Sequence, residues 1–391
     1  MSTVSEDVIG MTEFEVCRVD VTHEQIDDEY TPESRSEPVV HVCGYSESGD
    51  WHHEKIRGVE PYCYVRIEDA EQAQDIDPVK RVETLDDDGD PFRSVREDRM
   101  AKVYTYDTGG VSDVDDEFTQ TWESDVLFPN RFISEYDLES GVRVQRDPDE
   151  EYVDIQDVWT CTVYTDFRIH YLDIEVDDRN GFPENGVEPI ICITAYDNFD
   201  DEYIVWVWGD DVDIDSYPDE SAMHDADVDV RVCPNERVML LQYLGYIQGT
   251  QPAVMSGWNL DDFDLPYLWE RCQVLNAKAS PSDPEIPYER MSPMGDVMAH
   301  DYFGTRVRGR AVFDLLEGVK SAEYTDLESY RLEAVAQEFI GEGKETYVGR
   351  VGDLWTDDPE KLVEYNLKDV ELCVELDRRR SIIDFWREVS R

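Results

Sequence analysis

Three strand candidates lie close together in the middle of the chain and limit the folds that it can adopt. Ile169 to Val176, Ile190 to Ala195 and Tyr203 to Trp208 are each rich in β-branched and aromatic residues. Helix and strand candidates then alternate toward the C-terminus. Consecutive strands followed by this alternation are typical of a mixed central sheet flanked by helices. The sequence therefore predicts an α/β fold from about Asp166 onward.

The segments after these strands supply the alternation. A helix is predicted from Asn235, which would cap it, to Ile247, because its apolar residues share one face. The last helix is predicted from Pro359 to about Arg379, with Asp358 as the cap and Pro359 at the first helical position. Other predicted elements are strands at Ala253 to Gly257 and Ala311 to Leu315, a Pro-rich loop at Pro281 to Pro293, and helices at Phe263 to Leu275 and Leu332 to Ile340.

The first part of the chain has a different pattern, with short β-strands separated by acidic turns. Val39 to Tyr45 and Pro61 to Ile67 flank the turn-like segment Ser46 to Asp50, which predicts a hairpin. The acidic segments Asp86 to Asp90 and Asp113 to Glu117 are predicted to be loops that serve as solvated connections or as salt adaptations. The sequence thus predicts a β-rich domain over residues 1–165 and an α/β domain over residues 166–391.

The acidic charge is spread along the whole chain. Its 93 acidic and 35 basic residues give a net charge of −58, yet hydrophobic segments persist between the acidic runs, unlike in a disordered acidic chain. Concentrated salt would screen the self-repulsion of this charge, so the composition predicts adaptation to a halophilic cytoplasm. The sequence has no stretch apolar enough for a membrane span or a signal peptide, and we expect a soluble cytoplasmic protein.

Cysteine and histidine offer little chemistry in this sequence. Eight scattered cysteines without a CxxC pair favour small buried side chains over a zinc site or a disulfide framework. His41, His52 and His53 are predicted to lie on an exposed hairpin and not to form a metal cluster. The carboxylates are therefore the candidates for a reactive site.

Asp173 and Glu175 occupy the first of the three strand candidates with one residue between them. Residues i and i+2 of a strand point to the same face, so the two carboxylates would project together while Leu172 and Ile174 face the core. Alone, this triplet is weak evidence in so acidic a chain, and a salt-adapted surface is the alternative.

Two further motifs follow in the sequence. Asn259, Phe263 and Asp264 come after a short apolar strand and lead into a helix, for which the alternative is an N-cap cluster. Tyr365 and Asp369 lie in the final helix at i, i+4 spacing, which places both on one face, and a solvated pair is the alternative.

Taken in order, these residues resemble the DxE, N-x3-F/Y-D and Y-x3-D motifs of the DEDDy exonucleases. The surrounding runs Tyr171-Leu-Asp-Ile-Glu, Ser256-Gly-Trp-Asn-Leu and Glu364-Tyr-Asn-Leu-Lys-Asp resemble the proofreading domain of archaeal family B DNA polymerases. Gly58-Val-Glu-Pro-Tyr-Cys-Tyr-Val is similar to a strand of that family's N-terminal domain. The resemblance implies an RNase H-like 3′→5′ exonuclease domain preceded by a β-rich domain of the family B type.

The same resemblance implies a role for each carboxylate. Asp173 would bridge two divalent metal ions, Mg²⁺ or Mn²⁺, while Glu175 and Asp369 would complete the site that binds the nucleophilic water. Asp264 would support the second ion, and Tyr365 would orient the water or the scissile phosphate. Such hard cations prefer oxygen ligands, and four carboxylates without metal would raise the pKa of at least one of them.

The substrate implied by the resemblance is the 3′ end of a DNA strand. Asn259 and Phe263 would hold the terminal nucleotide, and capping and packing at a helix start is the alternative for both. Asp314 resembles a family aspartate of less certain role and stays outside the predicted site.

The polymerase palm motifs of the SLYPS, KxxNSxYG and YGDTD types do not occur in the sequence. Nucleotide addition by this chain alone is therefore not expected, and a separate or downstream palm-containing half is the expected partner. Two alternatives stay open. One is a free-standing 3′→5′ exonuclease in DNA repair or RNA processing, and the other is a catalytically silent DNA-binding or assembly module.

Overall fold

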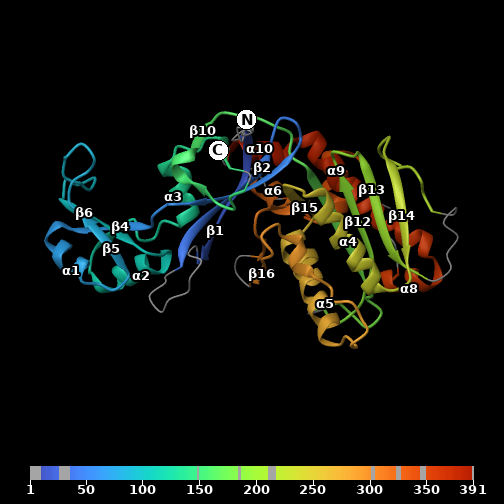
Figure 1. Ribbon diagram of the computed structural model, residues 1–391. Coiled ribbons are helices and arrows are strands. Elements are labelled where there is room, and N and C mark those ends of the chain that lie inside the picture. The colour runs from blue at the N-terminus through green and yellow to red at the C-terminus, as the bar shows by residue number, and fades with distance from the viewer. Residues whose placement is uncertain are drawn as a thin grey trace, which may run out of the picture. The chain divides into compact units, whose positions relative to one another are not determined.

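The computed structural model describes residues 10–25, 36–147, 149–183, 186–209, 217–300, 304–322, 327–343 and 349–389 (Figure 1). The chain divides into two compact units, Met1–Asp166 and Phe167–Arg391. Each unit has its own hydrophobic clusters. Among the described residues, no helix is both long enough and apolar enough to cross a membrane.

The first unit contains two sheets. The larger has the order β10-β8-β1-β2-β3-β9, formed by Val158–Cys161, Gly141–Arg146, Gly10–Glu24, Glu37–Tyr45, Trp51–Arg57 and Val153–Asp154. The smaller has the order β5-β6-β4-β7, formed by Val79–Glu83, Met100–Thr105, Tyr62–Arg66 and Thr121–Trp122. Its helices are α1 (Ala70–Gln74), α2 (Thr108–Glu117) and α3 (Phe128–Glu135), with short 3-10 helices at Ile67–Asp69 and Ile155–Asp157.

The predicted hairpin in this unit is wrong in its second strand. β2 turns at residues 46–50 into β3, and β4 pairs with β6 and β7 in the other sheet. The sequence of β3 is polar, so it carries little of the apolar signal that marks a strand. The segment Asp113–Glu117 is also not a loop, because it forms the end of α2, whose Val111 and Val114 are buried against the smaller sheet.

The histidines lie on the β2–β3 hairpin, but the prediction that they are exposed is wrong. His41 is 3% exposed, and its Nδ1 lies 2.8 Å from Nε2 of His53. His52 stacks on the buried ring of Phe14. These contacts come from the neighbouring strand β1 and from across the hairpin, so the local sequence does not reveal them.

The second unit is built on the mixed sheet that the sequence predicts. Its strand order is β14-β13-β12-β11-β15-β18. The strands are Asp227–Cys233, Glu202–Trp208, Ile190–Asp197, Ile169–Val176, Val254–Gly257 and Ala311–Asp314. β11, β12 and β13 pair antiparallel, whereas β14, β15 and β18 pair parallel with their neighbours. Separately, β16 (Val297–His300) pairs antiparallel with β17 (Gly304–Val307).

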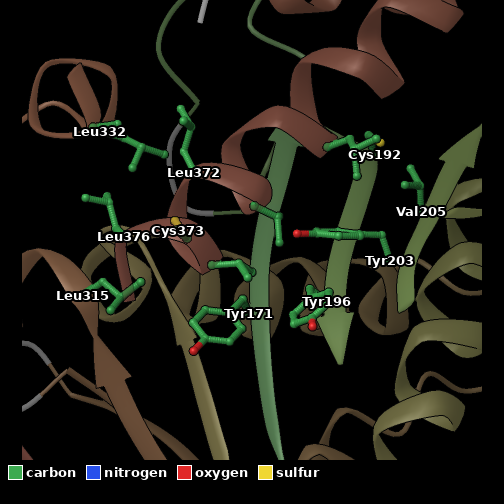
Figure 2. Close-up of a cluster of buried hydrophobic side chains, with 14 of the residues drawn as sticks. Tyr171, Cys192, Tyr196, Tyr203, Val205, Leu315, Leu332, Leu372, Cys373 and Leu376 are labelled. Carbon is green, nitrogen blue, oxygen red and sulfur yellow. The ribbon is translucent and has the colours of Figure 1, made fainter. Parts of the chain in front are cut away.

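Helices cover both faces of this sheet because residues alternate along β11. Leu172 and Ile174 pack with side chains of α4 (Glu236–Thr250) and α5 (Leu265–Ala277), and Tyr171 packs with those of α9 (Pro359–Arg380). Figure 2 shows the hydrophobic cluster that contains Tyr171, in which side chains of β11, β12 and β13 meet those of α9. The remaining helices are α6 (Leu315–Ala322), α7 (Leu332–Phe339), α8 (Val351–Asp357), α10 (Ile382–Val389) and a 3-10 helix at Tyr288–Met291.

The two predicted helix caps are confirmed. The Asn235 side chain accepts a hydrogen bond from the backbone N–H of Val238 at the start of α4, and Asp358 accepts one from Lys361 at the start of α9. Capping of this kind satisfies backbone donors that a helix leaves unpaired at its first turn. α4 and α9 therefore begin where the sequence predicts.

Candidate active site

The site begins with two half-buried carboxylates on β11. Asp173 and Glu175 alternate with the buried Leu172 and Ile174, so they lie on the α9 face of the sheet. Asp369 lies on α9, which packs on β11 and β12, and its side chain is buried. The helix therefore brings a third carboxylate over the strand that carries the first two.

The three carboxylates form one cluster. One oxygen atom from each of Asp173, Glu175 and Asp369 can be chosen so that all lie within 4.8 Å of one another. Carboxylate oxygens without thiolate or imidazole ligands are the donor set that hard cations such as Mg²⁺ and Mn²⁺ prefer. The donor set of this cluster therefore suits divalent cations of that kind.

Two cysteines border the cluster without joining its chemistry. Burial raises the pKa of Cys373 well above its ordinary value, and the nearby carboxylates of Asp173 and Asp369 raise it further. Burial acts in the same way on Cys192, helped by Glu175 and Asp173. Both thiols stay protonated, as the prediction of small buried side chains requires.

Asp264 lies beside the cluster but outside the group of three. Its Oδ1 accepts a hydrogen bond of 3.0 Å from the backbone N–H of Ile174, the residue between Asp173 and Glu175. Burial raises the pKa of Asp264 well above its ordinary value, and the nearby Asp314 and Asp369 add to that effect. A raised carboxylate pKa was expected here, although burial contributes more to it than charge repulsion does.

Asn259 begins a turn of π-helix that extends over Leu260–Asp264 and leads into α5. Its backbone is left-handed, with φ of 61°, and its side chain makes no capping hydrogen bond. The capping alternative is therefore wrong for this residue. Instead its backbone N–H donates to Oδ1 of Asp314 at 3.1 Å.

Phe263 belongs to an aromatic group at the start of α5. Its half-buried ring stacks on the ring of Tyr267, with centroids 5.6 Å apart. The ring of Phe182 also contacts Phe263, and the centroids of these two rings are 6.0 Å apart. Phe182 is 79% exposed. The sequence did not single out Phe182, because nothing in the loop after β11 marks an aromatic residue as a neighbour of Phe263.

Tyr365 lies one helical turn before Asp369 on α9 and is half-buried. The residue after it, Asn366, is fully buried, and its Nδ2 donates to Oδ2 of Asp173 at 2.6 Å. Asn366 is not among the site residues that the sequence predicts. The available signal was a polar residue in line with the apolar Leu362 and Val370, four residues away on either side.

Comparison with known proteins identifies the family. The model of "DNA polymerase family B, exonuclease domain" matches residues 120–335, which is more than half of the chain. The DNA-directed DNA polymerase of Enterobacteria phage T4 is 29% identical over 246 residues, covering 57% of this chain and 27% of that protein. The DNA polymerase of Pyrococcus glycovorans is 25% identical over 373 residues, covering 90% of this chain and 42% of that protein.

A solved structure of the family B DNA polymerase from Pyrobaculum calidifontis matches with a TM-score of 0.71 at 19% identity. The match covers 94% of this chain and 45% of that one, and it supports the predicted fold, an RNase H-like α/β domain preceded by a β-rich region. The chain spans less than half the length of each of these relatives.

Proposed function

Because the chain belongs to the family B DNA polymerases through their exonuclease domain, we propose that it removes nucleotides from the 3′ end of a DNA strand. The proposed reaction is hydrolysis of the terminal phosphodiester bond. In a replicating complex this activity serves proofreading.

The convergence of Asp173, Glu175 and Asp369 is the observation that carries this proposal. These residues come from a strand and from a helix about 200 positions later, and their oxygens share a space of a few ångströms. Three carboxylates that lie so close together repel one another unless protons or cations compensate them. We propose that these residues hold two divalent cations, Mg²⁺ or Mn²⁺. When bound, such ions supply Lewis acidity toward water and the phosphate.

We also propose a role for each of the surrounding residues. Asp264, which is buried and accepts a hydrogen bond from the backbone of β11, would support the second cation. Tyr365, on the same α9 face as Asp369, orients the attacking water or the scissile phosphate through its hydroxyl. Asn259 and Phe263 hold the terminal nucleotide, the first by hydrogen bonding and the second by stacking.

The proposal also covers the rest of the chain. We propose that residues 1–165 form the β-rich N-terminal domain of the family B type and residues 166–391 the exonuclease domain. Nucleotide addition would require a palm-containing partner or a longer polypeptide. The acidic composition supports adaptation to concentrated salt, so activity is best measured in high KCl.

Substitution of Asp173 by Ala tests the proposed site. Trimming of 5′-labelled single-stranded DNA in Mg²⁺ and high KCl should fall by at least about a hundred-fold, because a group that acts on charge in the transition state is lost. DNA binding, measured by fluorescence anisotropy, should be retained. Glu364→Ala is the matched control, because Glu364 is an exposed carboxylate on α9 next to Tyr365.

Unchanged trimming by the Asp173→Ala protein would show that the proposed site is wrong. Absence of trimming by the wild-type protein would instead favour a silent DNA-binding or assembly module. Parallel assays with RNA oligonucleotides distinguish a DNA enzyme from one that acts in RNA processing.

A further inference from the structure

We propose that Asn366 is a positioning residue that holds the carboxylate of Asp173 in its metal-binding orientation, and that Thr194 in turn fixes Asn366. This inference rests on the proposed function, since it takes Asp173 to be a metal ligand. Asn366 occupies one of the unspecified positions of the Y-x3-D motif, and Thr194 lies outside all three motifs.

Three side chains from three elements are joined in a row. Nδ2 of Asn366 on α9 donates to Oδ2 of Asp173 on β11 at 2.6 Å. The hydroxyl of Thr194 on β12 donates to Oδ1 of Asn366 at 2.5 Å. Thr194 is the residue directly opposite Asp173 in the antiparallel β11–β12 pair. The register of the two strands therefore places Thr194 and Asp173 side by side, where Asn366 can bond to both.

Burial of Thr194 and Asn366 fixes the orientation of the Asn366 amide. Thr194 and Asn366 are both 0% exposed, so water does not compete for their hydrogen bonds. If the amide of Asn366 were reversed, its oxygen would face the carboxylate of Asp173, and a buried acceptor would meet another acceptor. Only the orientation with the amide N–H toward Asp173 satisfies both ends.

The chemistry of the donor suits a metal ligand. The terminal torsion of an aspartate is broad, so a carboxylate held only at Cβ rotates easily. A hydrogen bond to Oδ2 restrains that rotation. A neutral amide achieves this without adding a positive charge, which would compete with a cation for Asp173.

The test compares metal affinity in variants of the full chain. Mn²⁺ binding is measured by the electron paramagnetic resonance signal of free Mn²⁺, a readout that does not depend on catalysis. Asn366→Ala should weaken Mn²⁺ binding by about 10- to 100-fold, the usual effect of removing a partner of a metal ligand. Thr194→Val should weaken it less. Thr194→Ser, which keeps the hydroxyl, should bind Mn²⁺ like the wild type.

Kinetics and a double variant separate positioning from general damage to the fold. In the Asn366→Ala protein, the kcat of DNA trimming should recover in part at saturating Mg²⁺, while the KM for DNA stays near the wild-type value. The Thr194→Val/Asn366→Ala protein should bind Mn²⁺ no more weakly than Asn366→Ala alone, because Thr194 acts only through Asn366. If Asn366→Ala does not fold, the comparison of Thr194→Val with Thr194→Ser decides the question.

Equal Mn²⁺ affinity in the wild type, Asn366→Ala and Thr194→Val would overturn the inference, as would additive losses in the double variant. Failure of the proposed function looks different, because Asp173→Ala would then bind Mn²⁺ as tightly as the wild type does.

Discussion

Asp314 organises the turn that carries part of the candidate site. Its Oδ1 accepts the backbone N–H groups of Asn259 at 3.1 Å and Leu316 at 2.9 Å, and its Oδ2 accepts that of Asp261 at 3.1 Å. Burial raises the pKa of Asp314, and these backbone hydrogen bonds oppose that shift. One side chain thus holds the left-handed start of the π-helix that ends at Asp264.

Substitution of Asp314 by Asn should therefore disturb the site from outside it. One of the two acceptor atoms becomes an NH₂ group, which faces a backbone donor and leaves it unsatisfied. We expect a loss of about 1–3 kcal/mol in the free energy of unfolding. Trimming should slow as well, because Asp264 and Phe263 follow on the same turn.

Urea denaturation and single-turnover trimming measure these two effects. Asp262→Asn is the control, because Asp262 is an exposed acid in the same turn. Equal stability and equal trimming rates in the two variants would show that the Asp314 hydrogen bonds do not organise the turn.

At the residue scale, local spacing accounts for two pairs of site residues, whereas the resemblance to the exonuclease motifs implied that these pairs share one site. The alternation of a strand places Asp173 and Glu175 together, and the period of a helix places Tyr365 and Asp369 on one face. Spacing does not reveal contacts between residues that lie far apart in the sequence. Asn366 contacts Thr194 and Asp173, which are more than 170 positions away, and only the packing of α9 on the sheet brings them together.

At the element scale, the β2–β3 hairpin contains two neighbouring histidines, of which His41 is buried and His53 is half-buried. The pKa of His53 is lowered to about 4, mainly by burial and also by the nearby His41 and Lys55, while Glu24 opposes the shift. Nε2 of His41 also lies 2.7 Å from the hydroxyl of Thr22 on β1. Burial thus lowers the pKa of both His41 and His53.

This arrangement predicts acid sensitivity of the first unit. Below the ordinary His pKa of 6.5 the unfolded chain binds a proton that folded His53 does not bind until about pH 4. The unfolded state then binds more protons, so stability falls as the pH is lowered from about 6.5 to about 4. Thermal unfolding across this range should show a smaller loss for His53→Gln than for the wild type. An identical loss in both proteins would contradict this account.

Elements with a strong local pattern were the ones that the sequence could predict. β11, β12 and β13 have dense β-branched and aromatic runs, and α9 has a cap and an apolar stripe. β14 was missed because acidic residues alternate with its valines. The π-helix at Leu260–Asp264 has no sequence period of its own, and the Asp314 hydrogen bonds that hold its start come from another strand.

At the scale of the whole molecule, the net charge of −58 controls how stability depends on salt. Self-repulsion of this charge opposes the compact state, and the Debye length falls to about 3 Å at 1 M salt. The midpoint of thermal unfolding should therefore rise between about 0.1 M and about 2 M KCl.

Sucrose at matched osmolality is the control, because it favours compact states by exclusion from the protein surface without screening charge. A rise in KCl that exceeds the rise in sucrose supports the electrostatic explanation. A midpoint that is flat or falling in KCl would contradict it.

The most direct test of the central claim is anomalous diffraction from crystals soaked in Mn²⁺. We predict anomalous density bounded by the carboxylates of Asp173, Glu175 and Asp369, and its loss in the Asp173→Ala protein. A wild-type protein that trims DNA but has no Mn²⁺ density at these three residues would contradict the account.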